Sequence, residues 1–324
     1  MSHVAYFALG GTIAMAGAPG GGVVARLTGE QLVATAGELP VEVQVADPSA
    51  VPSASLSFAN VLDLVDSARS AVDAGALGAV VTQGTDTLEE TAFLIDSVWD
   101  RDAPVIVSGA MRNPTQPGHD GPANLRAAVL AAASPATRCS GVLVAFADEL
   151  HAARHVRKTH STSIATFASP ELGPIGHVVE DAVRVYAATP PRTPVTGIDR
   201  DRLAATRVAV HTSLLDGHPD DLAAYAGRQG LVVAGFGAGH VPADQAPTLA
   251  SLAERMPVVL TTRTGAGRVL ERTYAAPGAE IDLLARGLIG GGSVHPYKAR
   301  VLLRLLIAAG ADTAGIGAAF AELS

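Results

Sequence analysis

The sequence predicts an α/β fold of two domains, each built on a mostly parallel sheet. Short apolar runs alternate with amphipathic segments of helix length, which is the pattern of strand–helix–strand units. The runs are apolar throughout, as expected for parallel strands that are covered on both faces. The chain has 324 residues, which exceeds the usual ~100–200 residues of one domain.

The first expected domain covers residues 1–188 and is doubly wound, with helices on both faces of its sheet. Its strands are expected at residues 4–9, 41–46, 79–82, 105–108 and 141–146. Helices between these strands are expected at residues 58–74, 88–99 and 122–133. Pro122 falls in the first turn of the last helix, where proline is tolerated.

The rhythm of strands and helices breaks at residues 189–205, where Thr-Pro-Pro-Arg-Thr-Pro begins a stretch expected to be an extended linker. The rhythm then resumes in residues 206–324, which we expect to form a smaller second α/β domain. Its expected strands are residues 207–212, 231–235 and 258–262, and a late helix is expected at residues 297–309.

Composition and charge exclude several classes of protein. Hydrophobic residues make up 48% and charged residues 17%, which suits a packed core and excludes disorder. The net charge is −8 and no basic run occurs, so we expect no nucleic-acid partner. The single cysteine, Cys139, excludes an internal disulfide and a cysteine-built metal site.

Without a signal-peptide pattern or an apolar stretch of ~18–20 residues, we expect a cytoplasmic protein that has no membrane partner.

Hydroxyl and carboxylate side chains follow two of the expected strands. Two glycines and Thr12 end the first strand, and Thr85 and Asp86 follow the strand at 79–82. Side chains at neighbouring strand ends could form a nucleophile site with a carboxylate. The alternative is that Thr85 or Asp86 caps the next helix, while Glu89 and Glu90 complement its dipole.

Two further segments have both a functional and a plain interpretation. The glycine-rich residues 14–26 follow the first strand and could be a mobile lid or an ordinary exposed loop. Lys158 lies in a basic, alternating run at 154–162. If it pointed inward, its neutral amine could take a proton from a threonine hydroxyl. An exposed basic edge strand is the simpler interpretation of the spacing alone.

The sequence motifs that are typical of zinc, dinucleotide and serine-hydrolase sites are incomplete in this chain. His151 and His155 have the spacing of a zinc helix, but Ala152 occupies the place of the required glutamate. Residues 235–240 lack the third glycine of a dinucleotide loop, and no Gly-x-Ser-x-Gly sequence occurs. We therefore expect neither a metal nor a cofactor.

Together these segments resemble the bacterial-type L-asparaginase family. The similar stretches are Gly-Gly-Thr-Ile-Ala at 10–14, Thr-Gln-Gly-Thr-Asp-Thr-Leu-Glu-Glu-Thr at 82–91, residues 108–125, residues 156–160 with 173–176, and His-Pro-Tyr-Lys-Ala-Arg at 295–300. The resemblance implies an amidohydrolase that converts L-asparagine to L-aspartate and ammonia without a cofactor. It also implies a flavodoxin-like sheet in the second domain and a homotetramer, a dimer of dimers whose active sites are shared between neighbouring subunits.

The resemblance also implies roles for individual residues. Thr12 matches the nucleophile, and Thr85, Asp86 and Lys158 match a second catalytic group in which the lysine activates the threonine. Asp86 would also hold the α-amino group of the substrate. Glu280 resembles a carboxylate that is donated across the dimer to the same group.

Ser53 matches the residue that grips the α-carboxylate of the substrate, with Ser55 as the competing choice. The main-chain N–H of Gly84 could face the oxyanion of an acyl intermediate. The chain departs from the family pattern at Ala54, where a glutamine is usual, and at His240, where an asparagine is expected.

A further departure is that no aromatic residue occurs between Phe7 and Phe58, so the usual lid tyrosine is missing. These differences leave two alternatives open. One is a glutaminase-asparaginase or a hydrolase of another ω-amide or D-amide. The other is a relative that binds aspartate or asparagine without catalysis.

Overall fold

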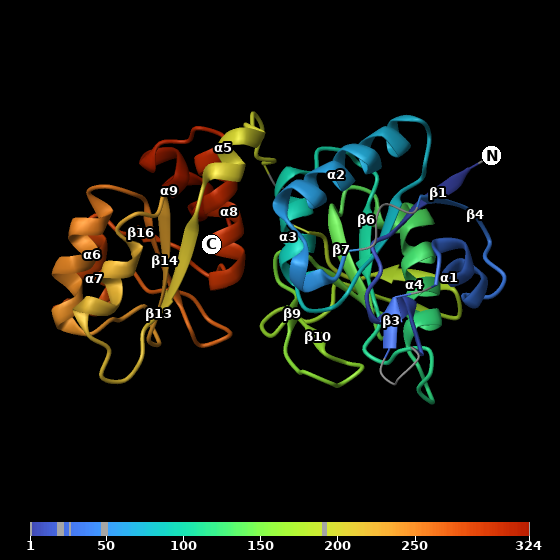
Figure 1. Ribbon diagram of the computed structural model, residues 1–324, viewed down its shortest axis with the longest axis horizontal. Helices are drawn as coiled ribbons and strands as arrows, with labels where there is room; N and C mark the ends of the chain where they lie inside the picture. The colour runs from blue at the N-terminus through green and yellow to red at the C-terminus, as the bar shows by residue number, and fades with distance from the viewer. Residues whose placement is uncertain (1, 18–22, 26, 47–50, 190–192, 324) are drawn as a thin grey trace. The chain divides into compact units, whose positions relative to one another are not determined.

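The computed structural model describes residues 2–17, 23–25, 27–46, 51–189 and 193–323. The chain forms two compact units, Met1–Pro194 and Val195–Ser324, and both have α/β architecture (Figure 1). A large, mostly parallel sheet and a separate smaller parallel sheet confirm the predicted fold class.

The first unit contains an eight-stranded sheet in the order β12-β11-β8-β7-β6-β5-β1-β4. Its strands are β1 (His3–Ala8), β4 (Glu42–Ala46), β5 (Ala79–Thr82), β6 (Val105–Ser108), β7 (Val142–Phe146), β8 (Glu149–Ala152), β11 (Gly176–Val179) and β12 (Ala182–Val185). The five strands from β4 to β7 are parallel, whereas β8, β11 and β12 extend the sheet in antiparallel pairs. All five strands expected from the sequence lie in the parallel part.

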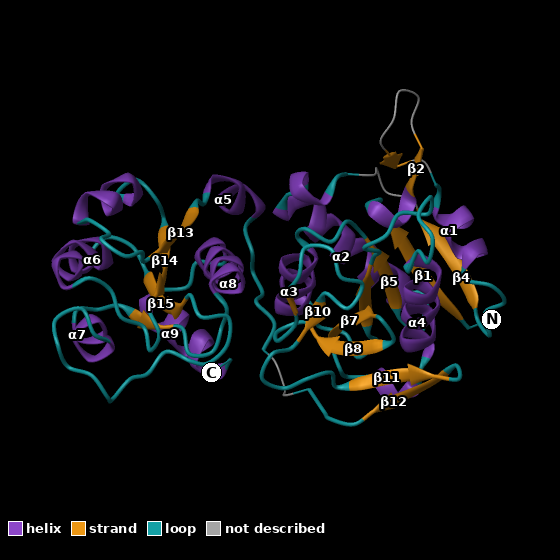
Figure 2. Cartoon of the chain, turned by 90° about the horizontal axis from the view of Figure 1, so that it is seen from below, coloured by secondary structure: helices purple, strands orange, loops and turns teal. Residues whose placement is uncertain are grey.

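Helices cover both faces of this sheet (Figure 2). They are α1 (Gly29–Thr35), α2 (Phe58–Asp73), α3 (Leu88–Val98) and α4 (Gly121–Ala133), with α2 and α3 on one face and α1 and α4 on the other. Val4 and Tyr6 of β1 and Ile106 of β6 pack in the core under α4. Both faces of these strands are therefore buried, which explains why their sequences are apolar throughout.

Two short antiparallel strand pairs of the first unit lie outside its eight-stranded sheet. The pair β2 (Met15–Gly17) and β3 (Val23–Ala25) follows β1, and β9 (Arg157–Lys158) pairs with β10 (Phe167–Ala168). Strands β2 and β3 belong to the glycine-rich segment 14–26, of which residues 18–22 and 26 lie outside the described residues. The lid therefore stays a prediction.

The second unit contains the parallel strands β13 (Val208–Thr212), β14 (Gly230–Gly235), β15 (Val258–Thr262) and β16 (Ile289–Gly290) in chain order. The connections η4 (Pro219–Tyr225), α6 (Ala246–Ala253) and α7 (Glu280–Ala285) share one core, as expected when every crossover is right-handed. Helices α5 (Arg200–Ala205), α8 (Pro296–Ala308) and α9 (Thr313–Glu322) cover the other face (Figure 2). The sequential order lacks the strand reversal of the expected flavodoxin-like sheet.

The expected linker at 189–205 is only partly extended, because its last residues form α5 in the second unit. Asp199 caps this helix by accepting a hydrogen bond from the N–H of Arg202 at 2.9 Å, and Leu203 is buried. Residues 190–192 of the expected linker lie outside the described part of the chain.

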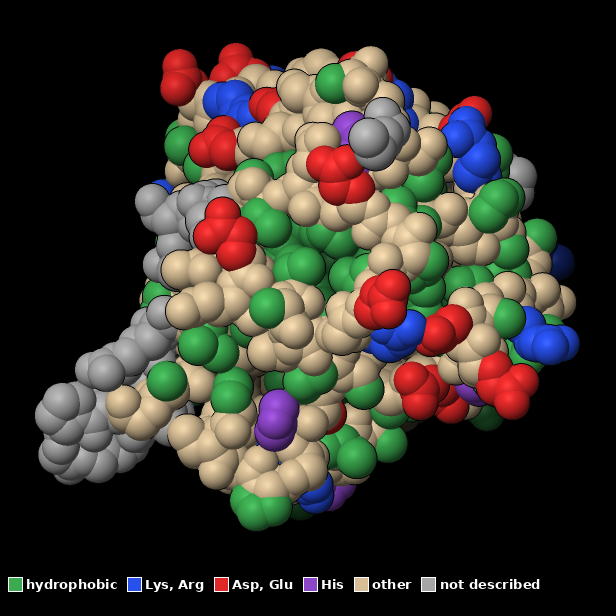
Figure 3. Space-filling model, turned by 90° about the vertical axis from the view of Figure 1, so that its right-hand side faces the viewer, with side chains coloured by type: hydrophobic (Ala, Val, Ile, Leu, Met, Phe, Trp, Pro, Cys, Tyr) green, Lys and Arg blue, Asp and Glu red, His purple; other side chains and the backbone are tan. Residues whose placement is uncertain are grey.

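The charged side chains on one face and the lengths of the described helices can be compared with the expectations about partners. On the face in Figure 3, basic and acidic side chains are interspersed, and Lys and Arg do not gather into a patch among the described residues. None of the described helices combines the length and the apolar character needed to cross a bilayer.

The position of α5 generates a prediction about stability. Replacing the buried Leu203 by alanine should lower the free energy of unfolding by ~2–4 kcal/mol, because the substitution leaves a cavity against α8. Urea unfolding of Leu203→Ala and of Ala204→Ser, an exposed neighbour on the same helix, measures the difference. Equal, small changes in both variants would mean that these residues behave as a linker after all.

Candidate active site

The candidate site is built on a close contact between two turns at the carboxyl ends of β1 and β5. Gly10 and Gly11 follow β1 with φ values of 88° and 90°, a region that favours glycine. A Cβ atom on Gly11 would lie 2.2 Å from the main-chain nitrogen of Gly84. Only glycine at position 11 therefore permits this contact, which brings Thr12 next to the turn that carries Thr85.

Lys158 of β9 reaches this turn with its amine. Its Nζ donates hydrogen bonds to Thr85 Oγ1 at 2.9 Å and to Asp86 Oδ1 at 3.2 Å. Thr85 is buried, Lys158 has a side chain that is 20% exposed, and the Asp86 side chain is 67% exposed. The inward orientation considered for Lys158 is the one observed, and the exposed edge strand is wrong for this residue.

This arrangement has the geometry of a proton-transfer pair. An amine within hydrogen-bond distance of a hydroxyl can take its proton when the amine is neutral and return it when charged. The carboxylate of Asp86 contacts the same amine but stays largely open to solvent, so it can also meet a cationic group of a ligand.

Ser53 lies beside the same turn, in the short helix η2 (Ser53–Ser55). It is buried, and its Oγ donates to Asp86 Oδ2 at 3.4 Å. A Cβ atom on Gly84 would lie 2.5 Å from Ser53 Oγ, so glycine is required here as well. The hydroxyl of Thr87 donates to the carbonyl of Ser53 at 2.9 Å and fixes η2 against the turn. Ser55, by contrast, is exposed.

Glu280 belongs to the second unit, where it begins α7 and is fully buried. Its Oε1 accepts hydrogen bonds from the main-chain N–H groups of Thr273 (3.0 Å) and Tyr274 (2.7 Å), and its Oε2 is bonded to His240 Nε2 at 3.0 Å. Burial raises the pKa of Glu280, but hydrogen bonds from the main chain of Tyr274, Glu280 and Thr273 and from His240 outweigh burial. The pKa of Glu280 therefore lies below its ordinary value.

Two residues near the site were not predicted to take part in it. The Glu89 carboxylate is buried and accepts a hydrogen bond from the main-chain N–H of Lys158. The Gln83 side chain is also buried, and its Nε2 donates to the carbonyl of Gly84 at 3.2 Å. Both lie within the segment 82–91, but the sequence does not show that a glutamate of a first helical turn points inward.

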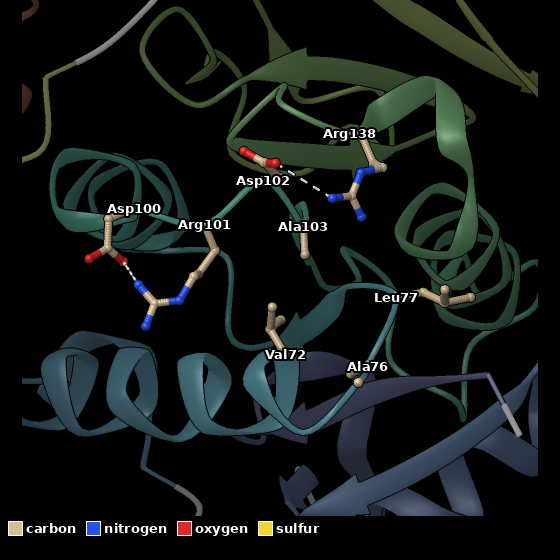
Figure 4. Close-up of a pocket in the computed structure, with 9 residues that line it drawn as sticks. Val72, Ala76, Leu77, Asp100, Arg101, Asp102, Ala103 and Arg138 are labelled. Atoms are coloured by element: carbon tan, nitrogen blue, oxygen red, sulfur yellow. Dashed lines mark ion pairs between the residues drawn. The ribbon is translucent and has the colours of Figure 1, made fainter.

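A hollow at the opposite edge of the sheet is a poor candidate for the site. This pocket of about 540 Å³ is formed by the end of α2 and by loops that precede β5, β6 and β7 (Figure 4). Its charges satisfy one another, since Arg101 pairs with Asp100 at 2.8 Å and Arg138 pairs with Asp102 at 3.5 Å. The polar groups at the carboxyl edge are therefore the stronger candidate, as is usual for open α/β sheets.

Comparison with known proteins covers both units. Residues 3–191 match the family model described as "Asparaginase, N-terminal". Residues 207–320 match the model described as "Glutaminase/Asparaginase C-terminal domain". The two matches together span most of the chain and follow the same order as the two units.

Similar proteins extend along almost the whole chain. An L-asparaginase of Bacillus licheniformis is 34% identical over 311 residues, covering 94% of this chain and 95% of the relative. A glutaminase-asparaginase of Pseudomonas aeruginosa is 32% identical over 314 residues, covering 93% and 85%. The crystal structure of a probable cytoplasmic L-asparaginase from Campylobacter jejuni superposes with a TM-score of 0.86 at 29% identity, covering 99% of both chains.

The contact between the two turns generates a prediction about stability. Gly11→Ala should lower the free energy of unfolding by ~3 kcal/mol or more, because unfavourable φ and a clash with the Gly84 main chain add together. Gly75→Ala is the matched control, since Gly75 has a φ of 107° but open space around it. The control should lose only ~1–2 kcal/mol. Equal losses in urea unfolding would contradict the close contact.

Proposed function

The chain belongs to the asparaginase family and is an amidohydrolase; from that premise, we propose that it hydrolyses L-asparagine to L-aspartate and ammonia through a threonine nucleophile. The observation that carries the proposal is the contact of Lys158 Nζ with both Thr85 and Asp86, next to the Gly11–Gly84 contact that brings Thr12 to the same edge.

Hydrolysis of an amide requires three kinds of group, and the residues at this edge can supply them. An amide is a poor electrophile, so the site needs a positioned nucleophile, donors for an oxyanion and a proton for the leaving ammonia. Thr12 Oγ1 attacks the side-chain amide carbon, with the N–H of Gly84 facing the oxyanion. The C–N bond then breaks, ammonia leaves with the proton from Thr12, and an ester remains on Thr12.

Hydrolysis of that ester needs a second proton transfer. Water attacks the ester carbon, its proton returns to Thr12 Oγ1, and L-aspartate leaves. Thr85 and Lys158 relay protons in both steps, because the amine lies 2.9 Å from the hydroxyl and 3.2 Å from a carboxylate that balances its charge.

The remaining residues account for recognition of an α-amino acid. Ser53 takes the α-carboxylate, and the exposed carboxylate of Asp86 takes the α-ammonium group. Glu280 supplies a second negative charge from the C-terminal unit of a neighbouring copy in a homotetramer, a dimer of dimers. We place the protein in the cytoplasm, in line with the similar Campylobacter jejuni protein.

A second candidate, a glutaminase-asparaginase, is favoured by one feature of the sequence. No aromatic residue occurs between Phe7 and Phe58, and Ala54 is small, so these positions offer little side-chain bulk against the extra methylene of glutamine. The similar Pseudomonas aeruginosa protein carries that name. A relative that only binds its ligand would not need the amine of Lys158 against a buried hydroxyl.

The proposed roles of the two threonines predict a loss of turnover. Thr12→Ala and Thr85→Val should each lower kcat for L-asparagine at least ~100-fold while the fold persists, because each removes a reacting hydroxyl. Ammonia release from L-asparagine, L-glutamine and D-asparagine is measured, with the exposed Thr35→Ala of α1 as the control. Wild-type turnover of Thr12→Ala would refute the nucleophile, and wild-type turnover of Thr85→Val would refute the proton relay. Equal turnover of glutamine would favour the second candidate.

The proposed role of Ser53 predicts a change in affinity. Ser53→Ala should raise KM for L-asparagine ~10-fold or more and alter kcat little, because a hydrogen bond to a charged group contributes ~1.5–3 kcal/mol. Ser55→Ala, on the same short helix but exposed, should leave both constants within ~2-fold. The reverse pattern would assign the carboxylate to Ser55.

A further inference from the structure

The amine of Lys158 is held by an unusually short piece of structure. Strand β9 has two residues and pairs with the two residues of β10, with Lys158 directly opposite Phe167. Two-stranded ribbons are marginally stable by themselves. A lysine side chain also has four flexible carbon–carbon links between its backbone and its amine. The position of Lys158 Nζ therefore requires an anchor outside the ribbon.

Glu89 is such an anchor on the side of the catalytic turn. Its carboxylate Oε2 accepts the main-chain N–H of Lys158, and within the described residues this is the hydrogen bond that its side chain makes. Glu89 is 6% exposed, and burying a carboxylate is costly unless it is hydrogen-bonded. Its place in the first turn of α3 lowers that cost, because the positive end of the helix dipole lies there.

We propose that Glu89 is a positioning residue that sets the distance between Lys158 Nζ and Thr85 Oγ1. Thr85 and Asp86 are separated from α3 only by its N-cap residue Thr87, and Glu89 is the second residue of that helix. The bond from Glu89 to the Lys158 backbone therefore ties the amine and both of its partners to one rigid element. This inference rests on the proposed function, in which Lys158 and Thr85 exchange protons.

Other contacts hold the far side of the ribbon. The ring of Phe167 packs on Phe146 of β7 with ring centres 4.7 Å apart, and Ser169 Oγ is 3.1 Å from Nδ1 of the buried His151. These contacts fix β10, whereas the bond to Glu89 fixes β9. The consequence for catalysis is large, because a displacement of ~1 Å at a reacting group can cost ~100-fold in rate.

The test compares kcat and KM of three substitutions at position 89. Glu89→Ala removes the acceptor and should lower kcat for L-asparagine ~10–100-fold, with KM within ~2-fold. Glu89→Asp keeps the charge but shortens the side chain by one methylene, so kcat should fall ~10-fold. Glu89→Gln keeps an acceptor oxygen at the same reach and should restore kcat to within ~3-fold of wild type.

A matched control exists on the same helix. Asp96 is also a buried carboxylate of α3, and its Oδ1 accepts the main-chain N–H of Val142 in β7 at 3.1 Å. Asp96→Ala should lower the melting temperature about as much as Glu89→Ala but leave kcat within ~2-fold. This comparison separates loss of helix stability from loss of position.

The inference is overturned if Glu89→Asp and Glu89→Ala keep wild-type kcat, or if Asp96→Ala lowers kcat as much as they do. If Glu89→Ala does not fold, the aspartate and glutamine variants decide the question by themselves. Failure of the proposed function has a different signature, since the wild-type protein would then release no ammonia from L-asparagine, or Lys158→Met and Thr85→Val would retain its turnover.

Discussion

The approach of Gly11 to Gly84 determines where the polar groups of the site lie, because it brings two turns closer than side chains would allow. Thr12 extends from one turn, and Thr85 and Asp86 extend from the other. Ser53 then fits against Gly84 for the same reason, since a Cβ atom there would overlap its hydroxyl. The absence of side chains at Gly11 and Gly84 thus allows hydroxyl groups from three separate segments to lie together at one edge of the sheet.

The groups collected at that edge differ in kind from the charges at the opposite edge. In the pocket before β5 and β6, arginines and aspartates pair with one another and leave little charge for a ligand. At the carboxyl edge, one ammonium group contacts a buried hydroxyl and a carboxylate that stays open to solvent. This edge therefore combines a proton path with a charge that a cationic group can reach, and the opposite edge offers neither.

The sequence predicts the architecture well where local patterns decide it. The apolar runs identify the five parallel strands, because a strand that is buried on both faces has apolar residues at successive positions. It predicts α5 poorly, since Leu203 alone among the residues of this short helix is buried and prolines precede it. Spacing favours an exposed Lys158, and its inward orientation depends on Phe167, Phe146 and Glu89, which are distant along the chain. Glu89 itself looks like an ordinary first-turn acid until its burial is known.

Buried carboxylates recur in both units, and each is used to hold main chain in place. Glu89 accepts the N–H of Lys158, Asp96 accepts that of Val142, and Glu280 accepts those of Thr273 and Tyr274. The hydrogen bonds that lower the pKa of Glu280 keep this carboxylate charged although it is buried. Its charge is therefore formed before any ligand arrives, and little reorganisation is needed when a cationic group approaches. A fixed charge of this kind fits the role that we propose for Glu280 toward an α-ammonium group.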